Sequence, residues 1–280
     1  MQTDDPCKTA GLRLRALHLL AERDPERKCG GVHELSRTWM AGEIALDADT
    51  PLTPTQPIPG RPDKPELVPP QSVNQRAMNT AEGRAAMIHA MTHIEFNAIN
   101  LALDAVWRFT GLPREYYADW LRVADEEAQH FSLLAAHLHT LGYTYGDFTA
   151  HDGLWDWAAK TQHDVLARMA LLPRTMEARG LDVTPGMRAK LVQAGDTEVA
   201  PIMDMILRDE IGHVAIGNRW FNYLCVRQGT EPLGTYRQLA SEYGAPSYRG
   251  PYNLDARRAA GFSELELQDL NFRKPSRTES

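Results

Sequence analysis

Two short patterns, Glu127-x-x-His130 and Glu210-x-x-His213, hold the residues of this sequence that are best suited to chemistry. An α-helix turns about 100° per residue, so a glutamate and a histidine three positions apart lie on one face. Together they can bind one metal ion, and carboxylate with imidazole ligation suits iron or manganese. The sequence therefore predicts two metal-binding patterns of the same kind.

Each pattern follows a helical segment with one inward-facing glutamate. Glu95 stands 32 positions before Glu127, and Glu177 stands 33 positions before Glu210. In helical projection Glu95 lies within roughly 60° of Ile88 and Ile99, in the middle of an apolar stripe. The stripe around Glu177 is less regular, because Arg174 interrupts it. An ionised carboxylate in an apolar interior is costly unless it is paired or binds a metal. We therefore expect both glutamates to complete the ligand set.

The charges of this ligand set balance. Four glutamates carry about −4 and two divalent cations carry +4, with His130 and His213 as neutral nitrogen ligands. No lysine or arginine lies on the helix faces of Glu95, Glu127 or Glu210 to neutralise them. Two such patterns are unremarkable by number alone, so the prediction depends on the shared core-facing angles and the matched spacing. The alternative, a set of core positions without a metal, stays open.

Two acids, Glu126 and Asp209, directly precede the glutamates of the patterns. Metal-bound histidines usually donate their other N–H to a carboxylate or a carbonyl. On one interpretation Asp209 supports His130 and Glu126 supports His213. On the other, both acids are solvated surface residues.

Two further histidines, His89 and His93, stand four positions apart, a spacing that can bind a metal on a helix. They lie about 120–160° from Glu95 in projection, so they face away from the predicted ligands. We expect a surface or interhelix role for this pair.

The elements that must position the ligands are helices. Apolar spacing predicts long helices over 82–109, 114–141 and 155–179, and over 187–228 with an interruption near Pro201. Gly180 and Pro185-Gly186 are expected to end the third of them. Since no period-two pattern stands out, the fold class is all-α. The ligand spacing predicts two helical hairpins joined by one longer crossover, as in a ferritin-like four-helix bundle.

The rest of the chain flanks this bundle. Residues 8–22 and 31–46 are expected to hold two short elements, and eight of the eighteen prolines lie between Pro51 and Pro70. Such a proline density predicts an extended, irregular strap. In chain order, we expect an N-terminal helical extension (1–50), a proline-rich strap (51–80), the bundle (81–228) and a C-terminal extension packed on the bundle (229–280). The last ten residues are expected to form a disordered tail.

Composition limits the surroundings of the protein. The 280 residues are 43% hydrophobic and 24% charged, with a net charge of −7, so no basic footprint indicates nucleic acid, although a local patch is not excluded. The three cysteines, Cys7, Cys29 and Cys225, form no disulfide framework, which favours a reducing cytoplasm. The N-terminus has no apolar signal region, and no run is long enough to span a membrane.

Several long stretches resemble the ferritin-like family known as DUF455, over about residues 10–270. The resemblance implies a ferritin-like bundle with a dinuclear iron site, and the arrangement is more distantly similar to the tRNA-hydroxylating di-iron enzymes. The ligands that it implies are Glu95, Glu127, His130, Glu177, Glu210 and His213. The resembling stretches are PELVPP (65–70), EGRAAMIHAMTHIEFNAINLALDAVWRF (82–109), EEAQHFSLL (126–134), GDFTAHDGLWDWA (146–158), MALLPRTMEARGLDVTPGM (169–187), RDEIGHVAIGNRWF (208–221) and GPYNLDARRAAGFS (250–263).

The leading hypothesis is an oxidase or monooxygenase in which two iron ions react with O₂ and oxidise an unidentified small-molecule substrate. Extensions of about 80 residues before the bundle and about 50 after it can shape a pocket, which a minimal iron-storage bundle does not need. The alternatives are a ferroxidase or iron-handling protein, a tRNA-modifying hydroxylase, and a non-catalytic helical protein. An Mn/Fe pair suits the ligands as well as Fe/Fe. The substrate, the electron donor and the oligomeric state stay open.

Overall fold

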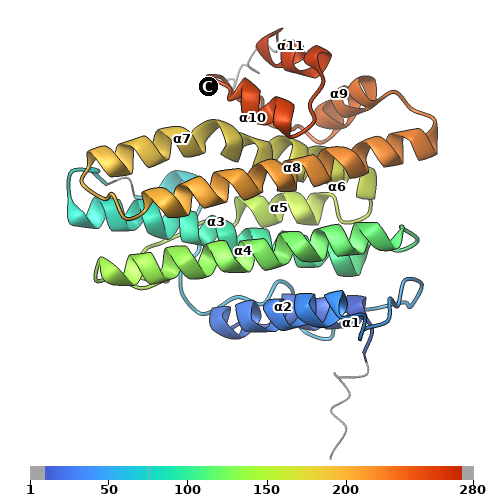
Figure 1. Cartoon of the computed structure of the whole chain (residues 1–280), viewed down its shortest axis with the longest axis horizontal. Coiled ribbons are helices and arrows are strands. Elements are labelled where there is room, and N and C mark those ends of the chain that lie inside the picture. Colours follow the sequence, from blue (N-terminus) through green and yellow to red (C-terminus); the bar gives the residue numbers. More distant parts are fainter. Residues whose placement is uncertain (1–9, 75, 273–280) are drawn as a thin grey trace, which may run out of the picture. The chain divides into compact units, whose positions relative to one another are not determined.

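The structure, a computed structural model, describes residues 10–74 and 76–272, and its regular elements are helices joined by loops (Figure 1). In these residues no strand forms, and only one isolated β-bridge joins Leu67 to Ala150. The chain divides into two compact units, one ending at Trp155 and the other beginning at Asp156. The all-α prediction is confirmed, whereas the ferritin-like arrangement and the domain boundaries stay predictions.

The first unit is built on a hairpin of two long helices, α3 (Ala81–Arg108) and α4 (Arg114–Thr140). Thr80 caps α3 by accepting a hydrogen bond from the backbone N–H of Gly83. Gly111 adopts a positive φ of 67° between the helices, which lets the chain reverse direction. The hairpin therefore brings the middle of α3 beside the middle of α4 (Figure 1).

Two shorter helices cover this hairpin, α1 (Leu12–Ala21) against α3 and α2 (Pro25–Met40) against α4. The second begins earlier than the expected 31–46, because the side chain of Asp24 caps it and Pro25 occupies its first position. The guanidinium of Arg13, which is only 2% exposed, donates to the carbonyl of Trp107 at 3.0 and 2.8 Å. This contact joins α1 to the end of α3.

The proline-rich segment 51–80 contains one short 3-10 turn, η1 (Pro70–Ser72), as its only helix among the described residues. Backbone hydrogen bonds join it to other segments of the first unit. The buried ammonium of Lys28 donates to the carbonyl of Gly60 at 3.1 Å, and the N–H of Val68 donates to the carbonyl of Ala150 at 2.8 Å. The segment is thus held by backbone groups that its prolines leave free.

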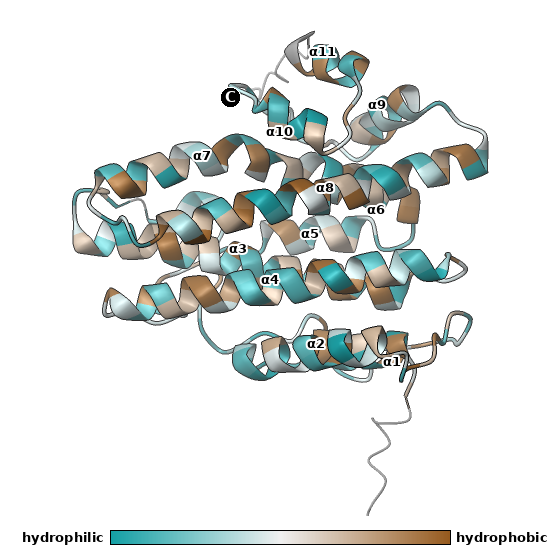
Figure 2. Ribbon diagram, in the orientation of Figure 1, coloured by the Kyte–Doolittle hydropathy of each residue, from teal (hydrophilic) through white to brown (hydrophobic). Residues whose placement is uncertain are grey.

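The second unit is also built on a pair of packed helices, α7 (Ala178–Gln193) and α8 (Ala200–Gln228). A helix α5 (Gly153–Lys160) leads into it, and α6 (Val165–Leu171) runs directly into a π-helical turn, η2 (Leu172–Glu177), and then α7. The remaining helices are α9 (Pro232–Glu242), α10 (Leu254–Ala259) and α11 (Glu264–Phe272). In Figure 2, hydrophobic and hydrophilic positions alternate along the long helices, as expected for amphipathic helices.

The expectation of one helix over 155–179 that ends near Gly180 was wrong. The chain breaks earlier, where the side chain of Asp164 caps α6, and α7 then continues through Gly180 and Pro185. The helix persists because it buries Leu181 and Leu191 completely, and this burial outweighs the backbone cost of the glycine and the proline.

The disordered tail was expected over residues 271–280. Of these, residues 273–280 lie outside the described residues, as does Cys7. Within the described part of the chain, none of the helices combines the length and the apolar character needed to cross a membrane.

Candidate metal centre

The first pattern meets its partner glutamate inside the α3–α4 hairpin. Nδ1 of His130 lies 3.3 Å from Oε2 of Glu127 on the same helix and 3.5 Å from Oε2 of Glu95 on α3. One ligand atom from each of the three residues lies within 4.8 Å of the others. This spacing allows a single metal ion to contact all three, since metal–ligand bonds are about 2.0–2.2 Å long.

All three side chains are buried, with Glu95 5% exposed, Glu127 1% and His130 not at all. Burial, followed by the carboxylate of Glu127, raises the pKa of Glu95 to about 8. Burial lowers the pKa of His130, but the contacts with Glu127 and Glu95 outweigh it and raise this pKa to about 12. The metal-free cluster therefore holds protons in the place of a cation.

The cluster fits a cation on its own geometry. Oε2 of Glu95 is buried and accepts no hydrogen bond from the described residues, although a buried carboxylate oxygen normally has a donor or a metal ion beside it. Two buried carboxylates and an imidazole are donors that could hold a metal ion.

The second pattern lies on α8. Nδ1 of His213 is 3.9 Å from Oε2 of Glu210, and the histidine is fully buried while the glutamate side chain is 13% exposed. Glu177 is the last residue of η2 and is half-buried. Ala178, which follows Glu177, and Val214, which follows His213, belong to one hydrophobic cluster. The turn that ends at Glu177 therefore packs against the segment that holds the second pattern.

The π-helical turn explains how Glu177 is presented. Pro173 has no N–H to donate, and the hydroxyl of Thr175 donates to the carbonyl of Ala170, five residues earlier, at 2.9 Å. A Cβ placed on Gly217 would lie 2.3 Å from Cβ of Pro173, so only glycine allows α8 to approach η2 this closely. The structure therefore has a wide turn at Pro173, a feature that is frequent at functional sites.

The two flanking acids have ion-pair partners on their own helices. Oε1 of Glu126 lies 3.8 Å from Nε of Arg122, and Oδ1 of Asp209 lies 2.9 Å from Nε of Arg208. Their side chains are 31% and 14% exposed, which places them at the edge of the core rather than fully in water. Their expected support of the histidine ligands stays a prediction.

The histidine pair set aside in the sequence is buried, so the surface interpretation was wrong. His89 stacks on Tyr145 at 5.4 Å and accepts a hydrogen bond from the N–H of Gly146, and His93 contacts the hydroxyl of Tyr145 at 2.8 Å. The ring of Tyr145 also lies 5.1 Å from Phe131, next to His130 in the chain. Helical projection located the face of this pair but gave no sign of the loop that covers it.

Comparisons with known proteins show the family of the chain and name no activity. The family described as "Protein of unknown function (DUF455)" matches residues 21–268. A protein of Haemophilus influenzae described as "Uncharacterized protein" is 46% identical over 257 residues, which cover 89% of each chain. No solved structure matches the chain.

Proposed function

The chain belongs to the DUF455 family, and we propose that it is a dinuclear iron protein that activates O₂ and oxidises a small-molecule substrate. The observation that carries this proposal is the buried cluster of Glu95, Glu127 and His130, in which a carboxylate oxygen has no hydrogen-bond donor. Two carboxylates placed together without water are tolerable when a cation lies between them.

The proposed ligand set combines this cluster with the second pattern. It repeats the donors of the first group on another hairpin, with a glutamate on one element and Glu-x-x-His on the next, as in ferritin-like di-iron proteins. We therefore include a ferritin-like fold in the proposal. The proposed ligands are Glu95, Glu127, His130, Glu177, Glu210 and His213, with Glu126 and Asp209 as supporting acids.

When bound, two iron ions would supply the reduction of O₂ that drives oxidation of the substrate. The residues of the chain have separate tasks. Glu95, whose pKa is raised, would give up its proton to make room for a cation, and His130 would offer a neutral nitrogen. The burial of all three side chains keeps bulk water from the cluster, which strengthens the electrostatic contacts inside it.

The test begins with protein purified without oxygen. Fe²⁺ is added, the bound iron is counted, and O₂ is then introduced while the absorption and the consumption of O₂ are followed. We expect two irons per chain and a transient absorption after mixing with O₂. Uptake of many irons per chain would favour an iron-handling protein instead, and failure to bind iron would refute the proposal.

Glu127→Gln provides the variant and Glu115→Gln the matched control. Both change one glutamate of α4, but Glu127 is 1% exposed whereas Glu115 lies on the exposed surface. We expect the first to lose most of the bound iron and the second to keep both ions. The oligomeric state, measured alongside, separates a cage-like ferroxidase from a discrete enzyme.

A further inference from the structure

A buried arginine in the second unit has donors that none of the described residues satisfies. Arg174, in the π-helical turn η2, is only 4% exposed, and its Nη2 pairs with Glu266 on α11. Its Nε and Nη1 are buried and have no hydrogen-bond partner among the described residues. A buried charged donor without an acceptor is costly, so these N–H groups call for an oxygen or an anion from outside the chain.

Aromatic rings hold the guanidinium of Arg174 in place. Its carbon lies 4.3 Å from the ring centroid of Phe221, 5.1 Å from that of Tyr236 and 5.3 Å from that of Phe262. These contacts fix the plane of the guanidinium and keep water away from its faces. The open N–H groups are therefore oriented before any ligand binds.

Two cavities of about 20 Å³ each lie against Arg174, and their charges differ. Glu266 and Asp269 line one of them. Among the described residues that line the other are Arg174 and Arg257 and no acidic side chain. Arg257, which is 3% exposed, is held by both carboxylate oxygens of Asp182 at 3.0 and 2.7 Å. Arg174 and Arg257 line both cavities, but only the cavity without an acidic side chain is suited to an anion.

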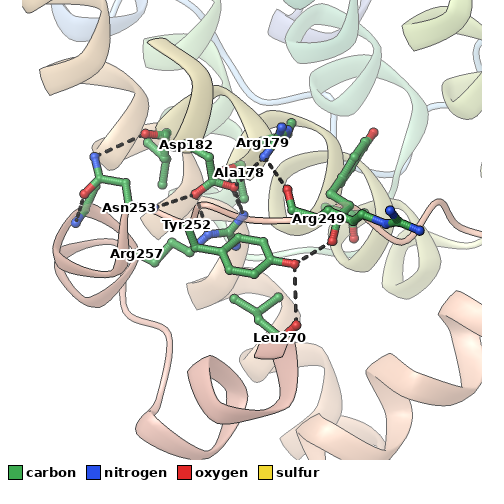
Figure 3. Close-up of polar contacts among 12 residues, drawn as sticks. Ala178, Arg179, Asp182, Arg249, Tyr252, Asn253, Arg257 and Leu270 are labelled. Atoms are coloured by element: carbon green, nitrogen blue, oxygen red, sulfur yellow. Dashed lines mark hydrogen bonds and ion pairs between the residues drawn. The ribbon is translucent and has the colours of Figure 1, made fainter. Parts of the chain in front are cut away.

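The anion-suited cavity shares a wall with a larger pocket. Tyr248, Tyr252 and Leu270 line both the small cavity and a pocket of about 300 Å³ that also includes Pro251. Figure 3 shows Tyr252 beside Arg257, with its hydroxyl turned toward the carbonyl of Leu270. A volume of 300 Å³ is at the lower end of pockets that hold small organic ligands.

We propose that this part of the second unit binds a small organic carboxylate, with a carboxylate oxygen between Arg174 and Arg257 and the remainder of the molecule in the larger pocket. A volume of 20 Å³ admits about one oxygen-sized group, so a single oxygen of the ligand can enter between the arginines. Hydrogen bonds from a charged arginine to a carboxylate are shorter and stronger than those between neutral groups. This inference does not depend on the proposed metal chemistry.

The test uses the full chain, with and without bound metal, and three probes: butyrate, its uncharged isostere butyramide, and inorganic phosphate. Isothermal titration calorimetry should show saturable 1:1 binding of butyrate and none of butyramide. Equal binding of butyrate and butyramide, tighter binding of phosphate, or no binding of butyrate would each overturn the proposal. A failure of iron binding in the same preparation would leave this result unaffected.

Variants locate the site. Arg174→Gln should weaken the binding of butyrate about tenfold or more, because it removes charge-assisted hydrogen bonds. Leu270→Trp keeps both arginines and fills the shared wall, so it should abolish binding even if the first variant folds poorly. Arg227→Gln, on the exposed surface of α8, is the matched control and should bind as the wild type does. Equal affinity in all three variants would place the ligand elsewhere and refute the assignment.

Discussion

Nδ1 of His130 lies 3.5 Å from Oε2 of Glu95, although 35 positions of the chain separate the two residues. The α3–α4 hairpin closes this distance, and it does so inside the core. An imidazole and a carboxylate buried together must share a proton or a metal ion.

The stability of the metal-free protein should depend on Glu95 in a defined direction. The pKa of Glu95 is raised from 4.5 to about 8 on folding, so the folded state binds this proton more tightly than the unfolded state. The contribution of Glu95 is therefore fully present below pH 4.5 and is lost as the pH rises toward 8. His130 acts in the same direction between pH 6.5 and 12.

The measurement is the free energy of unfolding of the wild type minus that of Glu95→Gln, from urea titrations at several pH values. We expect this difference to fall as the pH rises, by at most about 1.4 kcal/mol per pH unit. The exposed substitution Glu115→Gln should leave the pH dependence unchanged. Parallel curves for the wild type and Glu95→Gln would show that this carboxyl group is not perturbed.

Two glycines of α8 should respond oppositely to alanine. At Gly217 the new Cβ would lie 2.3 Å from Cβ of Pro173, so Gly217→Ala should destabilise the protein by about 1–3 kcal/mol. At Gly212 nothing lies within 4 Å, and Gly212→Ala should stabilise the helix by up to about 1 kcal/mol. Thermal unfolding of the two metal-free variants tests both signs. Equal effects would contradict the close packing of α8 on η2.

Arg13 should stabilise the first unit well beyond what a surface arginine does. Besides Trp107, its guanidinium donates to the backbone carbonyls of Asp47 at 2.8 Å and Thr50 at 2.9 Å. Arg13→Met would remove all of these donors, including the two in buried contacts with Trp107, and should cost about 3 kcal/mol. Arg37→Met, which removes an exposed pair with Glu34, should change the stability by less than about 1 kcal/mol. Similar losses in both variants would contradict this role.

The sequence predicted the α3–α4 hairpin closely, because its signals are local. The expected ranges 82–109 and 114–141 differ by one residue at most at each end from the observed helices. The apolar stripe is continuous there, and Gly111 with Pro113 marks the turn. The same signals placed Glu95, Glu127 and His130 on facing stripes, which the structure brings together.

The prediction was weakest around Glu177, for a physical reason. Helical projection assumes about 100° per residue, and the π-helical turn Leu172–Glu177 breaks that period directly before the glutamate. The stripe therefore looked irregular although the segment is helical. The burial of His89 and His93 was missed for another reason. The side chain that covers them, Tyr145, stands more than fifty positions later in the sequence.

The π-helical turn also sets a limit on how this chain can be shortened. Deleting one residue from Leu172–Glu177 would let the segment wind as an ordinary α-helix, but it would rotate α6 by about 100° against α7. The buried side chains of Leu166 and Ala170 would then turn away from their present neighbours. Every homologous sequence that keeps this packing should therefore keep the same length between Leu166 and Glu177, even where the residues differ.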